Sequence, residues 1–328
     1  MATDYSHAGR RRTPDPVACG LSPAPPARLS PRFAFAFIRA ADYTVFLEKI
    51  EIVNLTNTLP DGLRLREMGN RAIIALPEYM DVLAACEPAG LPEAGRGRAA
   101  IRRLELPSGR KLLVRQYHRG GVLRAINNSR YLSPRRAIDE IRVCREAAAR
   151  GVPVAVAAGA IVERQPPFWL CWLVTEEIEE AVDLGEYLRW LPAAPTREIL
   201  AEKRDIIDVL GAAIRAMHDA GLCHADLQAR NVLIRRSPAR IEVFFVDLDK
   251  STITGSLGES RRADNLRRLN RSILKMRLSP PPIDDDDRRR FLAAYRGGRP
   301  IFGDDVDGFL KTCRRHAAIH SIAWRIFK

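Results

Sequence analysis

The sequence has no run of about 18 apolar residues, which is the length that a helix needs to cross a bilayer. The short apolar segment at residues 33–38 is followed almost at once by Arg39 and Asp42. Cysteine is also scarce. The six cysteines lie singly along the 328 residues and form no CxxC motif or Cys/His cluster with metal-ligand spacing. This distribution is typical of reduced thiols in a cytosolic protein rather than of a metal site or a disulfide framework.

Acidic residues are too few to balance the basic ones. The chain has 53 Lys and Arg against 40 Asp and Glu, and its net charge is +13. A surplus this large indicates a polyanionic partner: nucleic acid, an anionic membrane or a phosphorylated substrate. An arginine-rich proteome would give the same surplus, so charge alone does not choose among them. The basic stretches lack the interleaved aromatic residues that single-strand binders use, and we expect no nucleic acid partner.

Composition changes along the chain and suggests its organisation. Residues 1–32 hold six prolines and little that could pack, which predicts a disordered extension, and residues 33–90 form a poorly defined lead-in. Strands are predicted at residues 99–106, 111–117, 154–162 and 168–175. Ser133-Pro134 opens a helix between the second and third strands, and the chain turns mainly helical after Glu176. We therefore expect an α+β architecture of two lobes, a sheet-rich one at residues 91–176 and a helical one at residues 177–328.

The most informative motif is His224-x-Asp226-x-x-x-x-Asn231, which lies between a predicted helix and two predicted strands. Phosphoryl transfer needs a carboxylate that accepts the proton of the acceptor hydroxyl, and Asp226 fits this role. It also needs an amide oxygen and a second carboxylate that hold Mg²⁺ on the phosphates of ATP. Asn231 and Asp247, at the end of the next apolar strand, fit these roles. We expect His224 to support the loop rather than to react.

Two carboxylates compete for the metal-binding role. Asp247 directly follows the apolar strand at residues 243–246, and Asp249 lies two residues further on. Protein kinases carry Asp-Phe-Gly at this place. The triplet here is Asp-Leu-Asp, which argues against an activation switch that depends on a flipping phenylalanine. Asp247 is the preferred metal ligand because of its position at the strand end, and Asp249 stays open as the alternative.

The nucleotide is expected to contact the first predicted hairpin. Gly95 and Gly97 precede it and would let backbone amides approach phosphates, although an ordinary turn has the same composition. Arg115 lies centrally in the second strand, where a kinase places its phosphate-binding lysine, and its guanidinium can bind phosphate in a bidentate manner. The helix after Ser133 offers two carboxylates that could hold Arg115. Glu140 is preferred over Glu146 because it lies nearer the start of the helix.

Taken together, these residues resemble the 3-deoxy-D-manno-octulosonic acid (Kdo) kinases of the lipopolysaccharide kinase family, which have a protein-kinase-like fold. The resemblance covers about residues 60–295. The matching stretches are residues 113–121, 151–154, 224–231, 245–250 and 265–272. The Arg-Gly-Gly stretch after the second strand and the Asn-Leu-x-Arg-Leu-x-Arg-Ser stretch are more specific than the general catalytic loop. Arginine at residue 115 also looks like this family.

The resemblance implies that the γ-phosphoryl group of ATP passes to the 4-hydroxyl of Kdo on lipid A. It also implies a peripheral location on the cytoplasmic face of the inner membrane. Residues 261–277 read as a basic helix that could face such an anionic glycolipid or the membrane surface. The candidate acceptor-binding residues on this helix are Arg267, Arg268, Arg271 and Lys275. A solvated basic face would have the same pattern.

Other acceptors and another class of protein stay open. The acceptor could be another core sugar or a protein serine, but no Ala-Pro-Glu triplet follows Asp247, as protein kinases usually have. A small cationic acceptor would need an acidic site, and the segment after Asp249 is basic. The chain could also be a membrane-associated pseudokinase that only binds. The presence of Asp226, Asn231 and Asp247 argues for catalysis.

Overall fold

The computed structural model describes residues 59–94, 101–118, 129–237 and 239–298, together with Gly308, Lys311 and Thr312. The chain divides into two compact units, Met1–Ile50 and Glu51–Lys328, and all described residues belong to the second unit. The predicted disorder at residues 1–32 and the predicted glycine loop at Gly95 and Gly97 lie outside the described residues.

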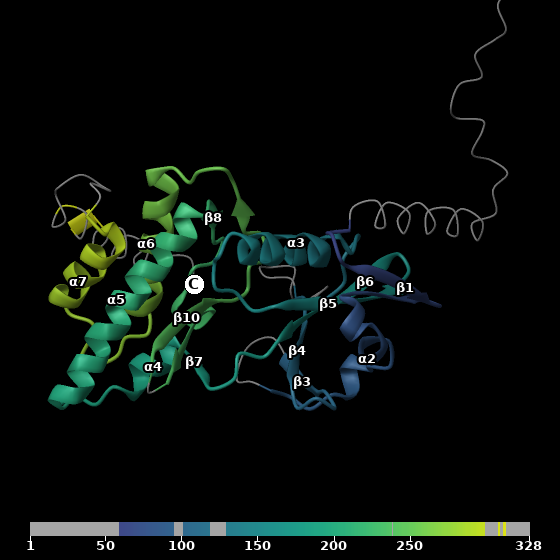
Figure 1. Cartoon of the computed structure of the whole chain (residues 1–328), viewed down its shortest axis with the longest axis horizontal. Coiled ribbons are helices and arrows are strands. Elements are labelled where there is room, and N and C mark those ends of the chain that lie inside the picture. The colour runs from purple at the N-terminus through teal and green to yellow at the C-terminus, as the bar shows by residue number, and fades with distance from the viewer. Residues whose placement is uncertain are drawn as a thin grey trace, which may run out of the picture. The chain divides into compact units, whose positions relative to one another are not determined.

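A six-stranded antiparallel sheet forms the small lobe (Figure 1). In spatial order its strands are β1 (Arg64–Met68), β2 (Arg71–Ala75), β5 (Ala157–Gln165), β6 (Phe168–Glu176), β4 (Lys111–Gln116) and β3 (Ile101–Glu105). The last four overlap the strands that the sequence predicts. β1 and β2 come from the region that the sequence analysis treats only as a lead-in. They extend the sheet because β2 pairs with β5 over residues 71–75.

The two faces of this sheet pack against different helices. Side chains alternate between faces along a strand, and β2 shows the alternation directly. Ile73 belongs to a buried cluster with Leu83 of α2 (Met80–Ala84), and Ile74 belongs to a second cluster with Ile138 of α3 (Arg135–Ala149). Two 3₁₀ turns, η1 (Pro77–Tyr79) and η2 (Pro88–Gly90), flank α2. The sheet is therefore covered on one face by α3 and on the other by α2.

The large lobe is mainly helical, as predicted. Its helices are α4 (Leu184–Trp190), α5 (Arg197–Asp219), α6 (Glu259–Leu274), α7 (Asp285–Arg296) and the 3₁₀ turn η4 (Ala229–Asn231). Its short strands are β7 (Ala181–Asp183), β8 (Leu222–Cys223), β9 (Val232–Arg236), β10 (Ile241–Phe245) and β11 (Thr252–Ile253). They form one sheet in the order β10-β9-β7 and a separate pair, β11-β8. The predicted basic helix at residues 261–277 corresponds to α6.

Helix α5 leads into the candidate catalytic loop. Its N-cap is Thr196, whose hydroxyl accepts a hydrogen bond from the backbone of Ile199 at 3.4 Å. Gly211 lets α5 approach α7 closely, because a Cβ atom at this position would lie 2.7 Å from the carbonyl oxygen of Phe291.

Among the residues that the structure describes, no helix has both the length and the apolar character needed to cross a membrane.

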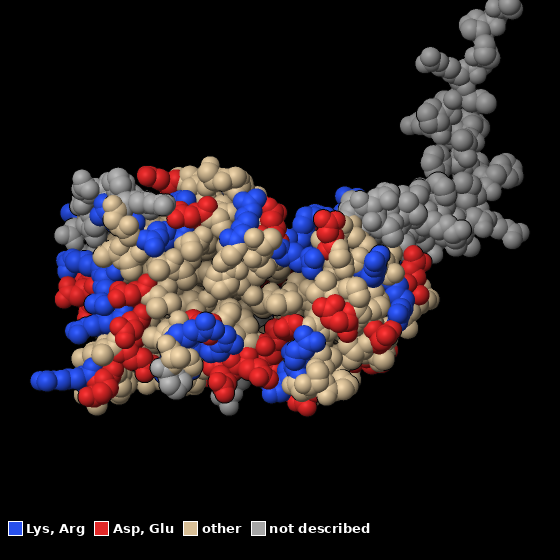
Figure 2. Space-filling model, viewed as in Figure 1, with Lys and Arg blue, Asp and Glu red and all other residues tan. Residues whose placement is uncertain are grey.

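Charges of both signs are mixed over the large lobe. Blue basic and red acidic side chains alternate on the face shown in Figure 2. Several form ion pairs between elements, such as Arg236 with Glu202 at 2.7 Å and Arg262 with Asp219 at 2.7 Å. Local pairing thus neutralises individual charges on this lobe, while the net surplus of the chain is unchanged.

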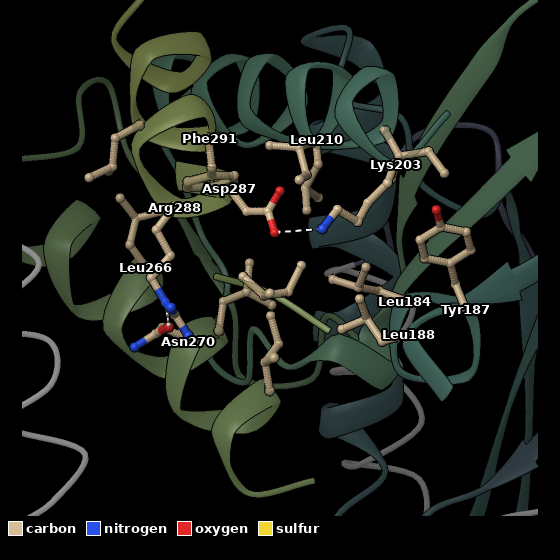
Figure 3. A pocket seen from close by; sticks show the side chains of 16 residues that line it. Leu184, Tyr187, Leu188, Lys203, Leu210, Leu266, Asn270, Asp287, Arg288 and Phe291 are labelled. Carbon is tan, nitrogen blue, oxygen red and sulfur yellow. Dashed lines mark hydrogen bonds and ion pairs between the residues drawn. The ribbon is translucent and has the colours of Figure 1, made fainter. Parts of the chain in front are cut away.

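An apolar pocket lies within the large lobe between α4, α5, α6 and α7 (Figure 3). Leu184, Leu210 and Leu266 belong to its lining. Its polar lining includes an ion pair between Lys203 and Asp287, whose Nζ and Oδ2 atoms are 2.7 Å apart, and a hydrogen bond from Arg288 to Asn270 at 3.3 Å. None of the candidate catalytic or nucleotide-binding residues lines this pocket, so it is separate from the candidate site for phosphoryl transfer.

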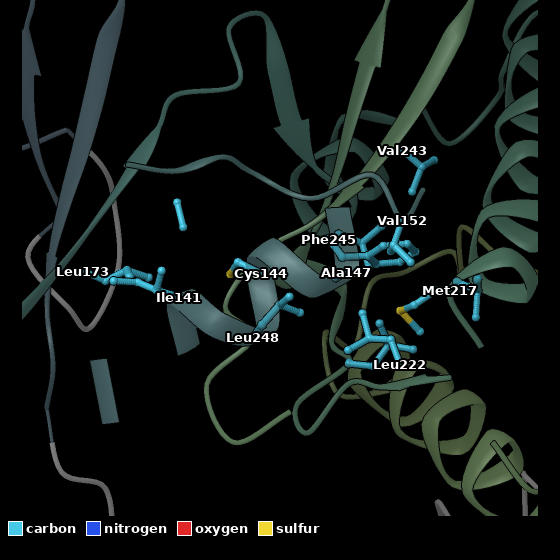
Figure 4. Packing of buried hydrophobic residues seen from close by; sticks show 14 of the residues in the cluster. Ile141, Cys144, Ala147, Val152, Leu173, Met217, Leu222, Val243, Phe245 and Leu248 are labelled. Atoms are coloured by element: carbon cyan, nitrogen blue, oxygen red, sulfur yellow. The ribbon is translucent and has the colours of Figure 1, made fainter. Parts of the chain in front are cut away.

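The hydrophobic core continues from the sheet into the large lobe through α3. Ile141 and Cys144 of α3 lie near Leu248, and Phe245 lies near Val152 in the same cluster (Figure 4). The backbone of Phe245 also donates a hydrogen bond to the carbonyl oxygen of Pro153 at 2.9 Å. This packing fixes the end of β10, and with it the two aspartates that follow, relative to α3.

Candidate active site

The candidate catalytic loop follows β8 and is organised around His224. The ring is buried, its Nδ1 atom accepts a hydrogen bond from the backbone of Asp226 at 3.1 Å, and its Nε2 atom donates to the carbonyl oxygen of Val246 at 3.1 Å. Burial lowers the pKa of His224, so the ring is neutral with its proton on Nε2. His224 therefore connects the loop to the end of β10, which agrees with the supporting role that the sequence suggests.

Side chains from α6 and the β11 region hold the same loop by its backbone. Asn265 accepts from the amide of His224 at 3.1 Å and donates to its carbonyl oxygen at 3.0 Å. The hydroxyl groups of Ser251 and Ser272 accept from the amides of Ala225 and Ala229 at 3.0 and 2.9 Å. The sequence pattern alone indicates no role for these three residues. The feature of the sequence that could have indicated Asn265 is the presence of a polar residue beside the apolar face of a predicted helix.

Asp226 projects from this loop with a partly exposed carboxylate. Its side chain is 36% exposed and accepts a hydrogen bond from the side chain of Gln228. Two guanidinium groups approach more loosely: Nη2 of Arg230 lies 3.4 Å from Oδ2, and Nη1 of Arg268 lies 3.8 Å from Oδ1. A carboxylate that is oriented and accessible in this way can accept a proton from a hydroxyl group.

Asn231 is buried and lies next to the start of the Asp-Leu-Asp segment. Its side-chain Nδ2 atom donates to the backbone carbonyl oxygen of Asp226 at 2.8 Å. The backbone carbonyl oxygen of Asn231 accepts from the amide of Val246 at 3.1 Å. Because the side-chain Nδ2 atom donates its hydrogen bond within the loop, the Oδ1 atom lies on the opposite side of the carboxamide group. Asp247 follows with φ at +61°, a conformation that is uncommon for a residue with a side chain. Strained backbone of this kind concentrates at functional sites.

Arg115 of β4 connects three elements. Its Nη2 atom donates to both carboxylate oxygens of Glu140 on α3 at 2.7 and 2.9 Å, and its Nη1 atom donates to Oδ1 of Asp247 at 2.9 Å. Burial alone would lower the pKa of Arg115, but these two carboxylates reverse the effect and raise it, so the guanidinium stays charged. Glu146, the alternative partner, pairs instead with Arg150 at 2.6 Å.

Asp249 has a different partner. Both of its carboxylate oxygens accept hydrogen bonds from Arg136 of α3, one of them from Nε at 2.7 Å. Its side chain is 15% exposed, whereas that of Asp247 is 33% exposed. Asp247 is therefore the more accessible of the two carboxylates, and the structure gives Asp249 an ion pair within the protein.

The donor set suits Mg²⁺ held together with a nucleotide. Among the described residues, no group of three or more His, Cys, Asp or Glu side chains could hold a metal ion by itself. Mg²⁺ is usually bound through one or two carboxylates and substrate phosphates rather than by an all-protein cage. Asp247 and the Oδ1 atom of Asn231 supply hard oxygen ligands of this kind, so the residues present fit the ion.

The structure separates the four basic candidates on α6. Arg268 reaches the catalytic loop, where it donates a hydrogen bond to the carbonyl oxygen of Ala225. Arg267 pairs with Asp264 within the helix. Arg271 and Lys275 follow Arg268 by about one and two helical turns. Arg268 thus contacts the loop directly.

This arrangement of two lobes, catalytic loop and inter-lobe ion pairs defines a protein-kinase-like phosphotransferase. The family model described as "Lipopolysaccharide kinase (Kdo/WaaP) family" matches residues 93–295. The chain belongs to this family. Membership confirms the family resemblance that the sequence predicts, and the similarity to a solved member of the same fold confirms the two-lobed α+β architecture.

Several curated relatives are similar to this chain. A 3-deoxy-D-manno-octulosonic acid kinase of Mannheimia succiniciproducens is 34% identical over 167 residues, which are 49% of this chain and 65% of that protein. The enzyme of the same name from Haemophilus influenzae is 30% identical over 190 residues, 55% of this chain and 73% of that protein. The match thus spans slightly less than two thirds of the first relative and more than two thirds of the second.

A solved structure supports the fold independently. The chain is similar to "WaaP in complex with acyl carrier protein" with a TM-score of 0.53 and 21% identity, and the match covers 78% of this chain and 98% of that one. At this level of identity the similarity concerns the fold alone.

Proposed function

We propose that the chain transfers the γ-phosphoryl group of ATP to the 4-hydroxyl of a Kdo residue on lipid A, in the assembly of the lipopolysaccharide inner core. The family and the names of the relatives support this acceptor. The observation that carries the proposal is the convergence of Arg115, Glu140 and Asp247 from three elements beside the loop of Asp226 and Asn231. This is the set of groups that phosphoryl transfer requires.

Each residue has a defined task in this reaction. Arg115 binds the phosphates of ATP, and Glu140 holds its guanidinium in place. Asp226 orients the sugar hydroxyl and accepts its proton as the bond to phosphorus forms. Asp247 and Asn231 would hold Mg²⁺, which neutralises charge on the transferring phosphoryl group when bound. Gly95 and Gly97 remain candidates for phosphate contacts.

The surroundings of Asp226 support an acidic sugar as acceptor. Arg230 and Arg268 flank its carboxylate at 3.4 and 3.8 Å, too far for the strongest charge-assisted hydrogen bonds. Both guanidinium groups are partly exposed, so they can turn toward the carboxylate of an incoming Kdo. Arg267, Arg271 and Lys275 extend the basic character of α6 for the phosphates of lipid A. The acceptor is embedded in the inner membrane, which implies a peripheral enzyme at its cytoplasmic face.

The test is transfer of labelled γ-phosphate from Mg²⁺-ATP to lipid A that bears a single Kdo, with Asp226→Asn as the matched variant. We expect transfer by the native chain and a loss of at least about 100-fold in the variant, the usual contribution of a positioned base. ATP binding should survive in the variant. Transfer at the native rate by Asp226→Asn would refute the role of Asp226.

The acceptor is tested separately from the enzyme class. Lipid A without Kdo and lipid A with a 4-deoxy sugar should accept no label. Transfer to either would refute the 4-hydroxyl as the acceptor and would direct attention to another core sugar. Binding of Mg²⁺-ATP with no transfer to any lipid would favour the pseudokinase alternative.

A further inference from the structure

The small lobe is joined to the Asp247-Leu248-Asp249 segment by two ion pairs that differ in one respect. Arg115 and Asp247, which form the first pair, are both proposed to contact Mg²⁺-ATP. The phosphates approach Arg115 and the metal approaches Asp247, so nucleotide binding acts directly on both members of this pair. Arg136 and Asp249, which form the second pair, contact neither phosphate nor metal in the proposed reaction. The second pair is therefore able to persist through the reaction.

We propose that the Arg136–Asp249 ion pair is a positioning device that keeps α3, and with it Glu140, at the active site whether or not nucleotide is bound. This inference rests on the proposed kinase function. It assigns Asp249 to α3 rather than to the metal, and it makes Arg136 and Asp249 positioning residues.

The geometry of Arg136 supports a fixed rather than a transient contact. The guanidinium donates to both oxygens of Asp249, and its Nη1 atom donates to the hydroxyl of Tyr131 at 2.8 Å. Its Cζ atom also lies 5.2 Å from the ring centroids of Tyr117 and of Tyr131. Such stacking on two aromatic rings restricts the side chain and adds a cation–π attraction. Solvent screens the pair little because both side chains are mostly enclosed.

Position on the helix links this pair to the nucleotide site. Arg136 and Glu140 are four residues apart on α3 and so lie on one face, one turn from each other. Tyr117 connects their surroundings, because its hydroxyl donates to Glu140 at 2.6 Å while its ring lies beneath both Arg115 and Arg136. Any movement of α3 away from Asp249 would carry Glu140 away from Arg115.

The Asp-Leu-Asp segment packs directly against α3. Leu248 is buried in the core next to α3, and Asp247 and Lys250 both have positive φ angles, +61° and +59°. The two carboxylates of this segment therefore have different partners. Asp247 pairs with Arg115, and Asp249 pairs with Arg136. In protein kinases the position of the corresponding helix is a point of control. Here the ion pair would set that position within the fold itself.

The first test measures the device without turnover. Amide hydrogen exchange across residues 135–149 should accelerate at least about tenfold in Arg136→Gln and in Asp249→Asn, and by the same factor in the double variant. Arg142→Gln is the matched control, because Arg142 lies on the same helix in an exposed pair with Asp139. Exchange in α3 that is unchanged in both test variants would overturn the inference, even if the protein transfers phosphate.

The second test separates positioning from metal binding. If Asp249 positions α3, then Arg136→Gln and Asp249→Asn should lower kcat/KM for ATP equally, by about tenfold or more, with no change in the Mg²⁺ concentration for half-maximal rate. Asp247→Asn should raise that concentration. A raised Mg²⁺ requirement in Asp249→Asn alone would make Asp249 a metal ligand and refute the proposal. If the native chain transfers no phosphate, the proposed function fails, while the exchange experiment still decides on the ion pair.

Discussion

The ion pair between Arg115 and Glu140 allows a quantitative test of how the site is held together. Glu140 is 2% exposed and takes two hydrogen bonds from Arg115 and one from the hydroxyl of Tyr117. We consider Arg115→Met, which keeps much of the aliphatic stem and removes the charge. The substitution leaves a carboxylate in the protein interior without its cation.

The expected loss of stability is large because the remaining charge is buried. Removal of one partner from a buried ion pair typically costs about 3–5 kcal/mol. Arg103→Met is the matched control. Arg103 makes a similar fork with Glu177, at 2.8 and 2.6 Å, but its side chain is 36% exposed. A pair open to solvent contributes about 1 kcal/mol or less. The two substitutions should therefore differ by at least about 2 kcal/mol in the free energy of unfolding.

The pH dependence of the free energy of unfolding tests whether the buried charge of Glu140 causes the loss of stability. Burial already raises the pKa of Glu140 and Arg115 opposes this shift, so loss of Arg115 raises the pKa further. A carboxyl group whose folded-state pKa exceeds its unfolded value takes up protons more readily in the folded state. Stability then falls as pH rises above about 4.5, by about 1.4 kcal/mol per pH unit. The defect of Arg115→Met should thus be smaller at pH 5 than at pH 7.

Urea unfolding of the native chain, Arg115→Met, Glu140→Gln and the double variant at both pH values measures these effects. The double variant should be more stable than Arg115→Met at pH 7, because the neutral amide removes the buried charge, and its stability should lack the added pH slope. The reasoning is refuted if Arg115→Met costs no more than Arg103→Met, or if Glu140→Gln adds a further loss to Arg115→Met.

Two other predictions concern the support of the catalytic loop. Gly221→Ala should destabilise the protein by about 3 kcal/mol or more and Gly151→Ala by about 1 kcal/mol. Both glycines have φ near +80° after a helix, but only at Gly221 would a Cβ atom meet a backbone oxygen, that of Thr254, at 1.9 Å. Equal losses in urea unfolding would contradict this. Burial lowers the pKa of His218 to about 4. The stability that the neutral His218 ring contributes is therefore complete above about pH 6.5 and is lost as the pH falls toward 4, and the total loss is about 3 kcal/mol. His218→Gln should remove this part of the pH dependence, and an unchanged slope would exclude His218 as its source.

Local sequence patterns were sufficient for much of the fold and for bringing Asp226 and Asn231 together in one candidate loop. The apolar run before Asp247 and the helix predicted before His224 depend on neighbours in sequence, and the structure has β10 and α5 there. The offsets of Asp226 and Asn231 are likewise local, because one loop places both residues. Pattern rules of this kind report periodicity and turn chemistry, and these features determine such elements.

Contacts between distant segments were beyond the reach of these patterns. Arg136 and Asp249 are 113 residues apart, and Asn265 holds an amide 41 residues earlier in the chain. A charged or polar residue in a helix has the same local appearance whether it faces solvent or a carboxylate of the other lobe. β1 and β2 were missed for a related reason. The burial pattern of β1 has no fully buried position, so its sequence carries little alternation, and its place in the sheet depends on pairing with β2.

The use of arginine rather than lysine at residue 115 follows from the number of groups that it must hold. Three N–H donors are needed for the bonds to Glu140 and Asp247. A lysine ammonium has three donors, and these bonds would use all of them, whereas a guanidinium has five and retains two. Those two donors can bind a phosphate oxygen while Glu140 keeps the side chain in place. The guanidinium also stays charged at any physiological pH, so its hold on both carboxylates does not depend on proton uptake. An arginine at this position can therefore connect β4, α3 and Asp247 and still bind the nucleotide, which a single lysine could not do at once.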